Sequence, residues 1–560
     1  MIDADAILAG LDEQQRRAAT SLGGPVAILA GAGTGKTRAI THRIAYGVAT
    51  GAQAEHASLA LTFTTRAAGE MRTRLARLGA GGVQARTFHA AALAQLSHFW
   101  PRVTGSRMPK LLPQKAATLA DAAAQLRLRL PTAALRDAAG EVEWRKSQAM
   151  TMEDYAVQAR IRPLPTGIDA ETMLDLHMAY ERVKDERRQI DFEDVLLATT
   201  GMLEREPVAA DAVRERYRHF TVDEYQDVSP SQQRLLAAWL GDRRDVCVVG
   251  DPSQTIYSFA GADAASLTRF VHDHEGAEVV RLVRSYRSTG AIVGMANRLM
   301  RGRDALVLET ASGEAGPEPS VAEHANDTAE AAAIAAACRA QVDAGADASQ
   351  IAVLTRFHAQ SGLIEQALAA VGLSSTVRGA MRFFDIPVVQ RAVLMLRGAP
   401  ADGRPVFQSV TDIVMTLGYR AEAPATHGQE RADWDALHAL VTLAEETGGT
   451  DLPAFARELA RRAQTEHEPS VAAVTIATIH AAKGLEWAHV HVAGVAEGLL
   501  PISHATSLAE IDEERRLLYV AITRAQRTLS LTWARHSGHQ VRQPSRFLAE
   551  LGTRTPASRR

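Results

Sequence analysis

The strongest constraint in the chain is an apolar run that leads into a glycine-rich turn, VAILAGAGTGKT at residues 26–37. Its glycines allow a tight turn whose backbone N–H groups point at phosphate oxygens. Lys36 adds a positive charge for the β- and γ-phosphates, and the Thr37 hydroxyl suits Mg²⁺. A strand before the turn and a helix after it separate this pattern from a glycine-rich turn without a ligand. We expect a nucleoside triphosphate to be bound by Ala30, Gly31, Ala32, Gly33, Thr34, Gly35, Lys36, Thr37 and Arg38.

A second polar segment, DEYQD at residues 223–227, follows the apolar run FTV. A carboxylate at the end of a strand can hold Mg²⁺, and a carboxylate beside it can deprotonate an attacking water. We assign Asp223 to the metal and Glu224 to the base. For such a segment alone, an acidic pair on a surface turn is the alternative. The phosphate-binding loop upstream favours the catalytic interpretation.

Strands alternate with amphipathic helices along most of the chain, which predicts an α/β fold with parallel sheets. Two stretches instead have a helical pattern throughout, and we interpret them as helical insertions into two α/β lobes. The first lobe is expected at 1–90 and 189–276, and its insertion at 91–188. The second lobe is expected at 277–383 and 471–550, its short insertion at 384–470, and a tail at 551–560.

Further segments occur in an order that resembles superfamily 1 helicases of the UvrD/PcrA/Rep type. They span residues 11–548 and read LDEQQRRAA, LTFTTRAAGEMRTRL, TFHA, IDFEDVL, VVGDPSQTIYSFAGA, LVRSYRST, TIHAAKGLEW, EERRLLYVAITRA and PSRFL. The resemblance implies two RecA-like lobes with ATP between them. It also implies an ATP-hydrolysing DNA helicase, an isomerase in current enzyme classes, that moves 3′→5′ on single-stranded DNA in repair or replication.

The same resemblance assigns roles to individual residues around ATP. Gln15 and Tyr286 are expected at the adenine, Glu486 at the ribose and Gln254 at the γ-phosphate as its sensor. Arg287 and Arg524 are expected to stabilise the charge that spreads over the γ-phosphate oxygens during transfer. An arginine chosen at random is usually a solvated surface group, so only the motifs single these two out.

Three segments, TFTTRAAGEMRTRL, AAKGLEWAHV and GLLPISHA, resemble in particular the second UvrD-type helicase of actinobacteria. That branch carries a cysteine-rich linker and an HRDC domain after the motor. The sequence stops about a dozen residues past PSRFL without those cysteines, so we expect either a motor-only relative or a shortened form. Ala260 stands where the family has an arginine, and the second insertion is short. The loop ARHSGHQVRQ at residues 534–543 has no aromatic residue at its tip. These departures predict weak strand separation by the monomer.

Several residues are expected to contact DNA. Phe63, Tyr257 and Phe259 follow strands, where exposed aromatic rings can stack on bases of any sequence. Thr65 and Arg66 could meet backbone phosphates. His89 and His480 lie in motifs that face DNA in the family. Ordinary packing in the core is the alternative for the aromatic residues and for both histidines.

Composition excludes several classes of protein. No uncharged apolar run reaches the ~18 residues that a membrane span needs, and the N-terminus has no signal-peptide pattern. The two cysteines form no CxxC pair, which argues against a zinc ribbon or a disulfide framework. The net charge of −3 neither indicates nor excludes a nucleic-acid partner. We expect a cytoplasmic protein that does not contact membranes.

The expected ligands are ATP and Mg²⁺, and the expected substrates are single-stranded DNA and 3′-tailed duplex. We expect a monomer or weak dimer, with an accessory protein as a possible partner. Two other functions fit the same motifs. One is a single-stranded-DNA-stimulated ATPase that remodels protein–DNA complexes, and the other is the motor subunit of a helicase–nuclease complex.

Overall fold

The structure is a computed structural model that describes residues 3–552, apart from 131, 163, 166, 259–260, 264, 379–386, 400–402, 421–432, 435, 438–439, 442, 446–448, 466–472, 504 and 538–539. The chain divides into two compact units, Met1–Val283 and Arg284–Arg560.

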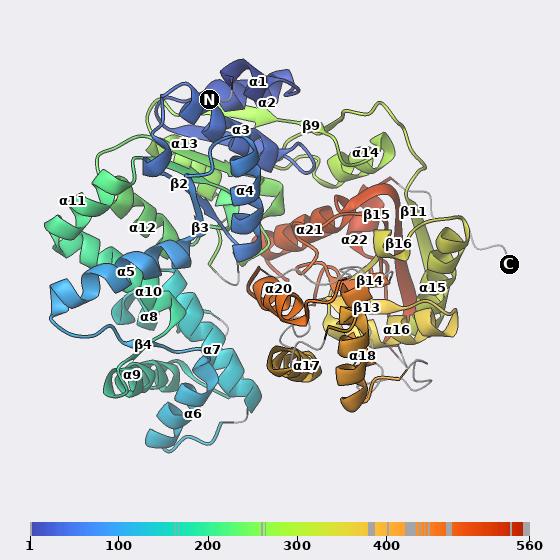
Figure 1. The fold of residues 1–560 in the computed structure, drawn as a ribbon. Coiled ribbons are helices and arrows are strands. Elements are labelled where there is room, and N and C mark those ends of the chain that lie inside the picture. The colour runs from blue at the N-terminus through green and yellow to red at the C-terminus, as the bar shows by residue number, and fades with distance from the viewer. Residues whose placement is uncertain are drawn as a thin grey trace. The chain divides into compact units, whose positions relative to one another are not determined.

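The first unit is built on a six-stranded parallel sheet (Figure 1). Its order is β3 (Gln84–Thr87), β2 (Ser58–Thr62), β6 (His219–Val222), β7 (Val246–Gly250), β1 (Val26–Ala30) and β8 (Glu278–Leu282). The central strands are short apolar runs because helices cover both of their faces. Since β8 pairs with β1, the expected start of the second lobe at residue 277 is too early.

Helices pack on both faces of this sheet and form two cores. One core takes side chains from α1 (Ala4–Leu8), α2 (Glu13–Thr20), α3 (Lys36–Ala49) and α4 (Thr65–Arg77). The other takes them from α5 (Phe88–Thr104), α10 (Phe192–Arg205), α11 (Pro207–Arg216), α12 (Pro230–Leu240) and α13 (Ser266–Asp273). In the second core the Trp239 ring stacks between Phe88 and Phe220.

A helical insertion with its own core follows α5. It contains α6 (Lys115–Gln125), α7 (Thr132–Ser147), α8 (Met152–Gln158) and α9 (Ala170–Glu186). The short strands β4 (Lys110–Leu111) and β5 (Gln189–Ile190) pair where the insertion begins and ends. The expected boundary at residue 91 is too early, because Ala91 and Leu96 of α5 lie in the core of the lobe.

The second unit contains a sheet with six parallel strands. Their order is β11 (Ser320–Asn326), β16 (Ala525–Ser537), β15 (Trp487–Val492), β12 (Ile351–Thr355), β14 (Val474–Thr478) and β13 (Ser375–Arg378). A further strand, β17 (Gln540–Val541), pairs antiparallel with the end of β16. The two parallel sheets confirm the predicted α/β class with two RecA-like lobes.

Two helices, α15 (Asp327–Asp343) and α16 (Ser361–Ala370), form the core on one face of this sheet. The sheet also contacts α14 (Gly290–Leu299) and α21 (Leu508–Ile522), which pack against each other. The short helix α22 (Arg546–Glu550) contacts α14. A two-stranded ladder of β9 (Arg284–Ser285) and β10 (Glu309–Thr310) lies at the start of the unit.

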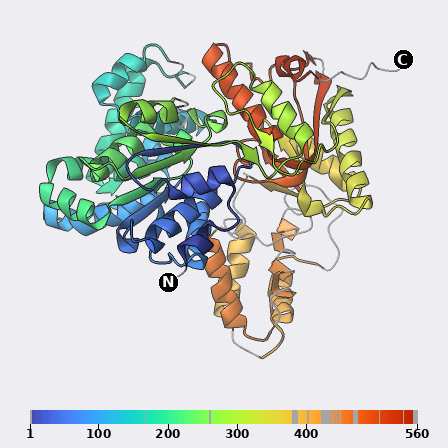
Figure 2. The same ribbon diagram turned by 90° about the horizontal axis from the view of Figure 1, so that it is seen from above.

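A separate helical group of the second unit contains α17 (Pro387–Gly398), α18 (Val406–Thr416) and α20 (Leu452–Thr465). Figure 2 shows these yellow-to-orange helices side by side and extending away from the sheet. Their apolar side chains, such as Val389, Val410 and Leu459, form one cluster. Both expected ends of this insertion, residues 384 and 470, lie outside the described residues. Among the helices that the structure describes, none is long and apolar enough to cross a membrane.

Candidate functional site

The glycine-rich turn between β1 and α3 has the backbone that a phosphate-binding loop requires. Gly33 and Gly35 have φ values of 75° and 79°, a region that residues with a Cβ seldom adopt. Gly35 caps α3, so the first N–H groups of that helix are directed into the turn. The buried Gln15 donates from Nε2 to the Thr34 carbonyl at 3.0 Å. A Cβ at Gly35 would lie only 2.7 Å from that Nε2, so glycine is also needed for this close approach.

Lys36 and Glu224 meet although 188 residues separate them in the sequence. The Lys36 Nζ lies 3.1 Å from Glu224 Oε1 and 3.2 Å from Oε2. Burial opposes the charge of Lys36, but nearby carboxylates, chiefly Glu224 and Asp251, raise its pKa above the ordinary value. The loop therefore presents a charged ammonium group together with the backbone N–H groups, which is the donor set that phosphates need.

Asp223 lies at the end of β6, where it is 7% exposed. Burial and the neighbouring charge of Glu224 raise the pKa of Asp223 to about 7. A buried carboxylate whose ionised form is disfavoured gains stability from a divalent cation. Asp223 thus fits a Mg²⁺ site, and Thr37, on the first turn of α3, offers the hydroxyl for it.

Gln254 belongs to the turn that follows β7, the strand between β6 and β1. Its Nε2 donates to Asp251 Oδ2 at 2.7 Å, and Asp251 Oδ1 accepts from the Ser253 N–H at 3.0 Å. The predicted γ-phosphate sensor is therefore held by Asp251, the residue directly after β7. Asp251 carries no sequence signal beyond its place in a polar segment after a strand.

The predicted nucleotide residues of the second unit include two arginines with different surroundings. Arg287 Nε lies 2.5 Å from Glu486 Oε2, and its Nη1 donates to the Thr523 carbonyl at 3.1 Å. Arg524 is only 2% exposed, and its Nη1 donates to the Leu485 carbonyl at 3.1 Å. Tyr286 is 53% exposed, as a ring that stacks on a base must be. The structure thus brings Arg287 and Glu486 together.

The comparisons with known proteins agree with these motifs over most of the chain. The family model for the UvrD/REP helicase N-terminal domain matches residues 11–275. The model for the UvrD-like helicase C-terminal domain matches residues 280–399 and 407–536. The chain belongs to the UvrD-like helicase family. The resemblance seen in the motifs is thereby confirmed.

Curated relatives from this UvrD-like family cover nearly the whole chain. The ATP-dependent DNA helicase UvrD2 of Mycobacterium tuberculosis is 46% identical, over 99% of this chain and 83% of the relative. DNA helicase II of Escherichia coli is 30% identical, over 98% of this chain and 88% of the relative. The ATP-dependent DNA helicase PcrA of Bacillus subtilis is 27% identical, over 97% of this chain and 86% of the relative.

Two of the predicted DNA-stacking aromatics lie together in this UvrD-like chain. The Phe63 and Tyr257 rings stack with centroids 5.5 Å apart and planes 13° from parallel. Phe63 is 44% exposed, so the pair presents an aromatic surface rather than a packed core. Nearby, Thr65 begins α4, and the exposed Arg66 pairs with Glu70 one helical turn later. Phe259 and Ala260 lie outside the described residues.

The two predicted DNA-binding histidines are neutral at neutral pH. Burial, together with the charge of Lys115, lowers the pKa of His89 to about 4. Burial likewise lowers the pKa of His480 to about 4, with a contribution from Arg356. Among the described residues, the buried Nε2 of His89 has no hydrogen-bond partner. Neither histidine therefore acts as a cation for phosphates, although hydrogen bonding to DNA stays open to them.

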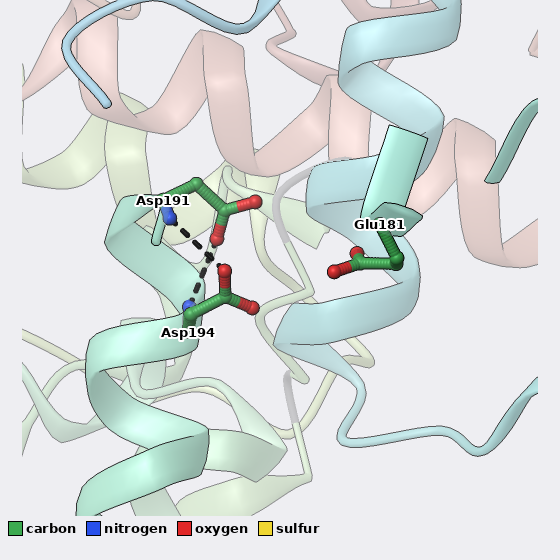
Figure 3. A group of neighbouring side chains, drawn as sticks. All are labelled: Glu181, Asp191 and Asp194. Atoms are coloured by element: carbon green, nitrogen blue, oxygen red, sulfur yellow. Dashed lines mark hydrogen bonds between the residues drawn. The ribbon is translucent and has the colours of Figure 1, made fainter. Parts of the chain in front are cut away.

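A group of three carboxylates, Glu181, Asp191 and Asp194, resembles a metal site in its spacing. Figure 3 shows Asp191 and Asp194 joined by two hydrogen bonds at the start of α10, with Glu181 facing them from α9. Lys146 Nζ occupies the space between them, 2.7 Å from Asp191 and 2.6 Å from Asp194. Lys184 Nζ contacts all three carboxylates as well. Two ammonium groups already contact all three carboxylates and offset most of their charge, so the cluster does not fit a metal ion.

The scarcity of lysine in the sequence is the signal that could have pointed to these residues. The chain has only six lysines among its 62 basic residues, and three of them, Lys115, Lys146 and Lys184, pair with carboxylates in or beside the first insertion. Lysine and arginine are not interchangeable, because an ammonium is a compact point charge and a guanidinium is a planar fork. In a chain whose basic residues are nearly all arginine, the few lysines were therefore positions to consider as sites with a specific role.

Proposed function

We propose that this protein is an ATP-dependent DNA helicase that hydrolyses ATP to move 3′→5′ along single-stranded DNA. The observation that carries the proposal is the meeting of Lys36 and Glu224 at the carboxyl edge of a parallel sheet, in a UvrD-like chain. Lys36 belongs to the phosphate-binding loop, and Glu224 stands where an attacking water needs a base. The relatives' names, ATP-dependent DNA helicase and DNA helicase II, support the same activity.

In this proposal the first unit binds the phosphates and activates the water. The N–H groups of the turn and the Lys36 ammonium hold the phosphates, while Asp223 and Thr37 hold Mg²⁺, which would neutralise charge on the phosphate oxygens. Once Lys36 turns to the phosphates, the Glu224 carboxylate is released from this ammonium group and can accept a proton from water. Gln254 would sense the γ-phosphate from the turn after β7.

The second unit would contribute the charge that stabilises the transition state. We propose Arg287 and Arg524 as the two arginine fingers, with Tyr286 and Gln15 at the adenine and Glu486 at the ribose. The pairing of Arg287 with Glu486 supports a common site for these two residues. Arg524 now bonds to carbonyls of its own unit, so as a finger it would exchange these bonds for phosphate oxygens.

DNA would be held by stacking on the Phe63 and Tyr257 pair, because base stacking on aromatic rings is worth ~1–3 kcal/mol per base and tolerates any sequence. Thr65, Arg66, His89 and His480 would add contacts to the strand. The proposed direction of movement rests on the family alone. We further propose a cytoplasmic monomer or weak dimer that works on 3′-tailed duplexes, with DNA repair or replication as its setting.

The test is ATP hydrolysis measured with and without single-stranded DNA, followed by unwinding of a 3′-tailed and a 5′-tailed duplex. We expect DNA to stimulate hydrolysis and the 3′-tailed duplex alone to be unwound. Hydrolysis that ignores DNA would refute the motor assignment. Preference for the 5′-tailed duplex would refute the polarity while leaving the motor intact.

A second candidate is an ATPase that displaces proteins from DNA and unwinds little. It is favoured by the shortness of the hairpin that ends β16, the loop whose sequence predicts weak strand separation. Only two residues of β17 pair with β16, at His536 with Val541 and at Ser537 with Gln540. Of the three residues expected at the tip, Ser537 lies in β16, and Gly538 and His539 lie outside the described residues. Strand displacement measured beside displacement of streptavidin from biotinylated DNA separates the two candidates. Fast streptavidin release with little unwinding would favour remodelling.

A further inference from the structure

Gln226 is a fully buried polar residue that no motif role accounts for. It lies in the short 3₁₀ turn Tyr225–Asp227 that follows β6, with 0% of its surface exposed. A buried amide is costly unless its donors and acceptor are satisfied. Its partners therefore show what its position is built for.

Both ends of the Gln226 amide contact the catalytic edge of the sheet. Its Nε2 donates to Glu224 Oε2 at 2.5 Å and lies 3.3 Å from Asp227 Oδ2. Its Oε1 accepts from the Asp251 N–H at 3.1 Å. One side chain thus connects the proposed base after β6 with the turn after the neighbouring strand β7. Through Asp251, that turn also holds Gln254.

The end of β7 is shaped around this amide. A Cβ placed on Gly250 would lie 2.3 Å from Gln226 Oε1, closer than any real contact, and 2.8 Å from Leu267 Cδ1. Glycine at 250 has an ordinary β conformation in the strand, so its conformational freedom is not the reason for it. The space that it leaves is filled by the Gln226 amide.

Glu224 needs such support because its backbone is unfavourable. It has φ 53° and ψ 42°, the left-handed region that residues other than glycine seldom adopt. Strained residues persist only where surrounding contacts hold them in place. Lys36 supplies one contact, but in the proposed function Lys36 turns to the phosphates. Gln226 is then the amide that still holds the Glu224 carboxylate.

We propose that Gln226 is a positioning residue for ATP hydrolysis, which fixes the Glu224 carboxylate and ties it to the Asp251–Gln254 turn. The proposal rests on the proposed function, since it assigns a support to the base of that reaction. Gln226 touches neither phosphate nor water in this account. It acts by keeping base and γ-phosphate sensor in one geometry, and small displacements of such groups are costly to the chemical step.

The test is Gln226→Met, which keeps the length of the side chain and removes all three hydrogen bonds of the amide. Loss of a hydrogen bond to a charged group predicts a fall in kcat of about 10- to 100-fold. We expect the KM for ATP and the affinity for single-stranded DNA to stay within about twofold of the parent chain, because Lys36, Phe63 and Tyr257 are untouched. A role in packing alone would instead lower Tm and leave kcat intact.

Gln233→Met is the matched control. Gln233 lies on α12 in the same unit and donates to the Val228 carbonyl at 3.2 Å and to Ser266 Oγ at 3.0 Å, and neither acceptor belongs to Glu224, Asp251 or Gln254. The same loss of amide bonds there should leave kcat within about twofold. An equal fall in kcat in both variants would overturn the positioning role, since it would show a general effect of lost hydrogen bonds.

A second variant, Gly250→Ala, displaces the amide of Gln226 without removing it. It should lower kcat in the same way, and adding it to Gln226→Met should cause little further loss, because both act through one contact. Parental kcat in Gln226→Met, or losses that multiply in the double variant, would overturn the proposal. If the parent chain itself hydrolyses no ATP, the proposed function fails first and this inference falls with it.

Discussion

Replacing Lys146 with methionine should destabilise the first unit by removing one of the two ammonium groups from its carboxylate cluster. Lys146 on α7 is 1% exposed and contacts Asp191 and Asp194 of the α10 start, together with Glu181 of α9. Asp191 is also 1% exposed. Burial opposes the ionised form of Asp191, but Lys146 and Lys184 keep its pKa well below the ordinary value. The cluster therefore fixes the helical insertion to the lobe by charge.

The size of the effect follows from this burial. Removing one partner of a buried ion pair costs about 3–5 kcal/mol, because the charge left behind is poorly solvated. The first unit ends at Val283, so an unfolding entropy of ~2.1 cal/mol/K per residue gives about 0.6 kcal/mol/K for it. Lys146→Met should then lower the Tm of this unit by about 5–8 °C.

Calorimetry or circular dichroism at pH 7.5 provides the assay, with Lys110→Met as the control. Lys110 is exposed on β4, so its loss should change stability by less than about 0.5 kcal/mol, or about 1 °C. The difference between Lys146→Met and the parent should hold down to about pH 4 and narrow below it. The depressed pKa of Asp191 gives stability that is fully present above the pKa of an unfolded aspartate, ~3.9, and is lost as pH falls from there toward the lower pKa of the folded state. A Tm loss no larger than that of Lys110→Met, or a difference that widens toward pH 4, would refute the reasoning.

Four further outcomes are expected. Lys36→Ala should weaken ATP binding and turnover together, whereas Glu224→Gln should keep ATP bound while kcat falls by orders of magnitude; titration with ATP beside steady-state kinetics checks both. Arg524→Ala should abolish DNA-stimulated hydrolysis with nucleotide affinity changed only severalfold, and a full response to DNA would rule it out as a finger. His539→Tyr should raise unwinding more than hydrolysis in single-turnover assays if its loop meets the fork. Burial lowers the pKa of His491 to about 4, so its contribution to stability is lost as pH falls from ~6.5 toward 4. His491→Gln should reduce by up to about one the number of protons that unfolding takes up in this range, and the Tm should fall less steeply with acid.

Much of the candidate site could be predicted because its signals are local. The strand, glycine turn and helix at residues 26–37 form one continuous segment, so their conformation follows from the residues themselves. The order of motifs predicted the family, which the comparisons confirmed. The individual roles of Glu224, Gln254, Arg287 and Arg524 stay predictions, since only the proposed experiments test them.

The boundaries of the lobes could not be predicted as well. Residues of α5 have the same helical pattern as the insertion that follows, yet α5 packs with α10 in the core of the lobe. Helical periodicity shows which face of a helix is buried and does not show against what. The strand β8 was likewise placed in the wrong lobe, because a short strand pattern does not name its neighbour.

The sequence by itself determined the elements and the chemistry that each can carry: a phosphate loop after β1, carboxylates after β6 and a polar turn after β7. Only the tertiary structure decided which of these meet. The sheet order β6-β7-β1 brings Glu224 to Lys36 and lets Gln226 reach the Asp251 N–H. The packing of the helical insertion likewise brings Lys146 of α7 and Lys184 of α9 to Asp191. Such contacts join residues far apart in the chain, and they depend on strand order and helix packing, which local propensities do not encode.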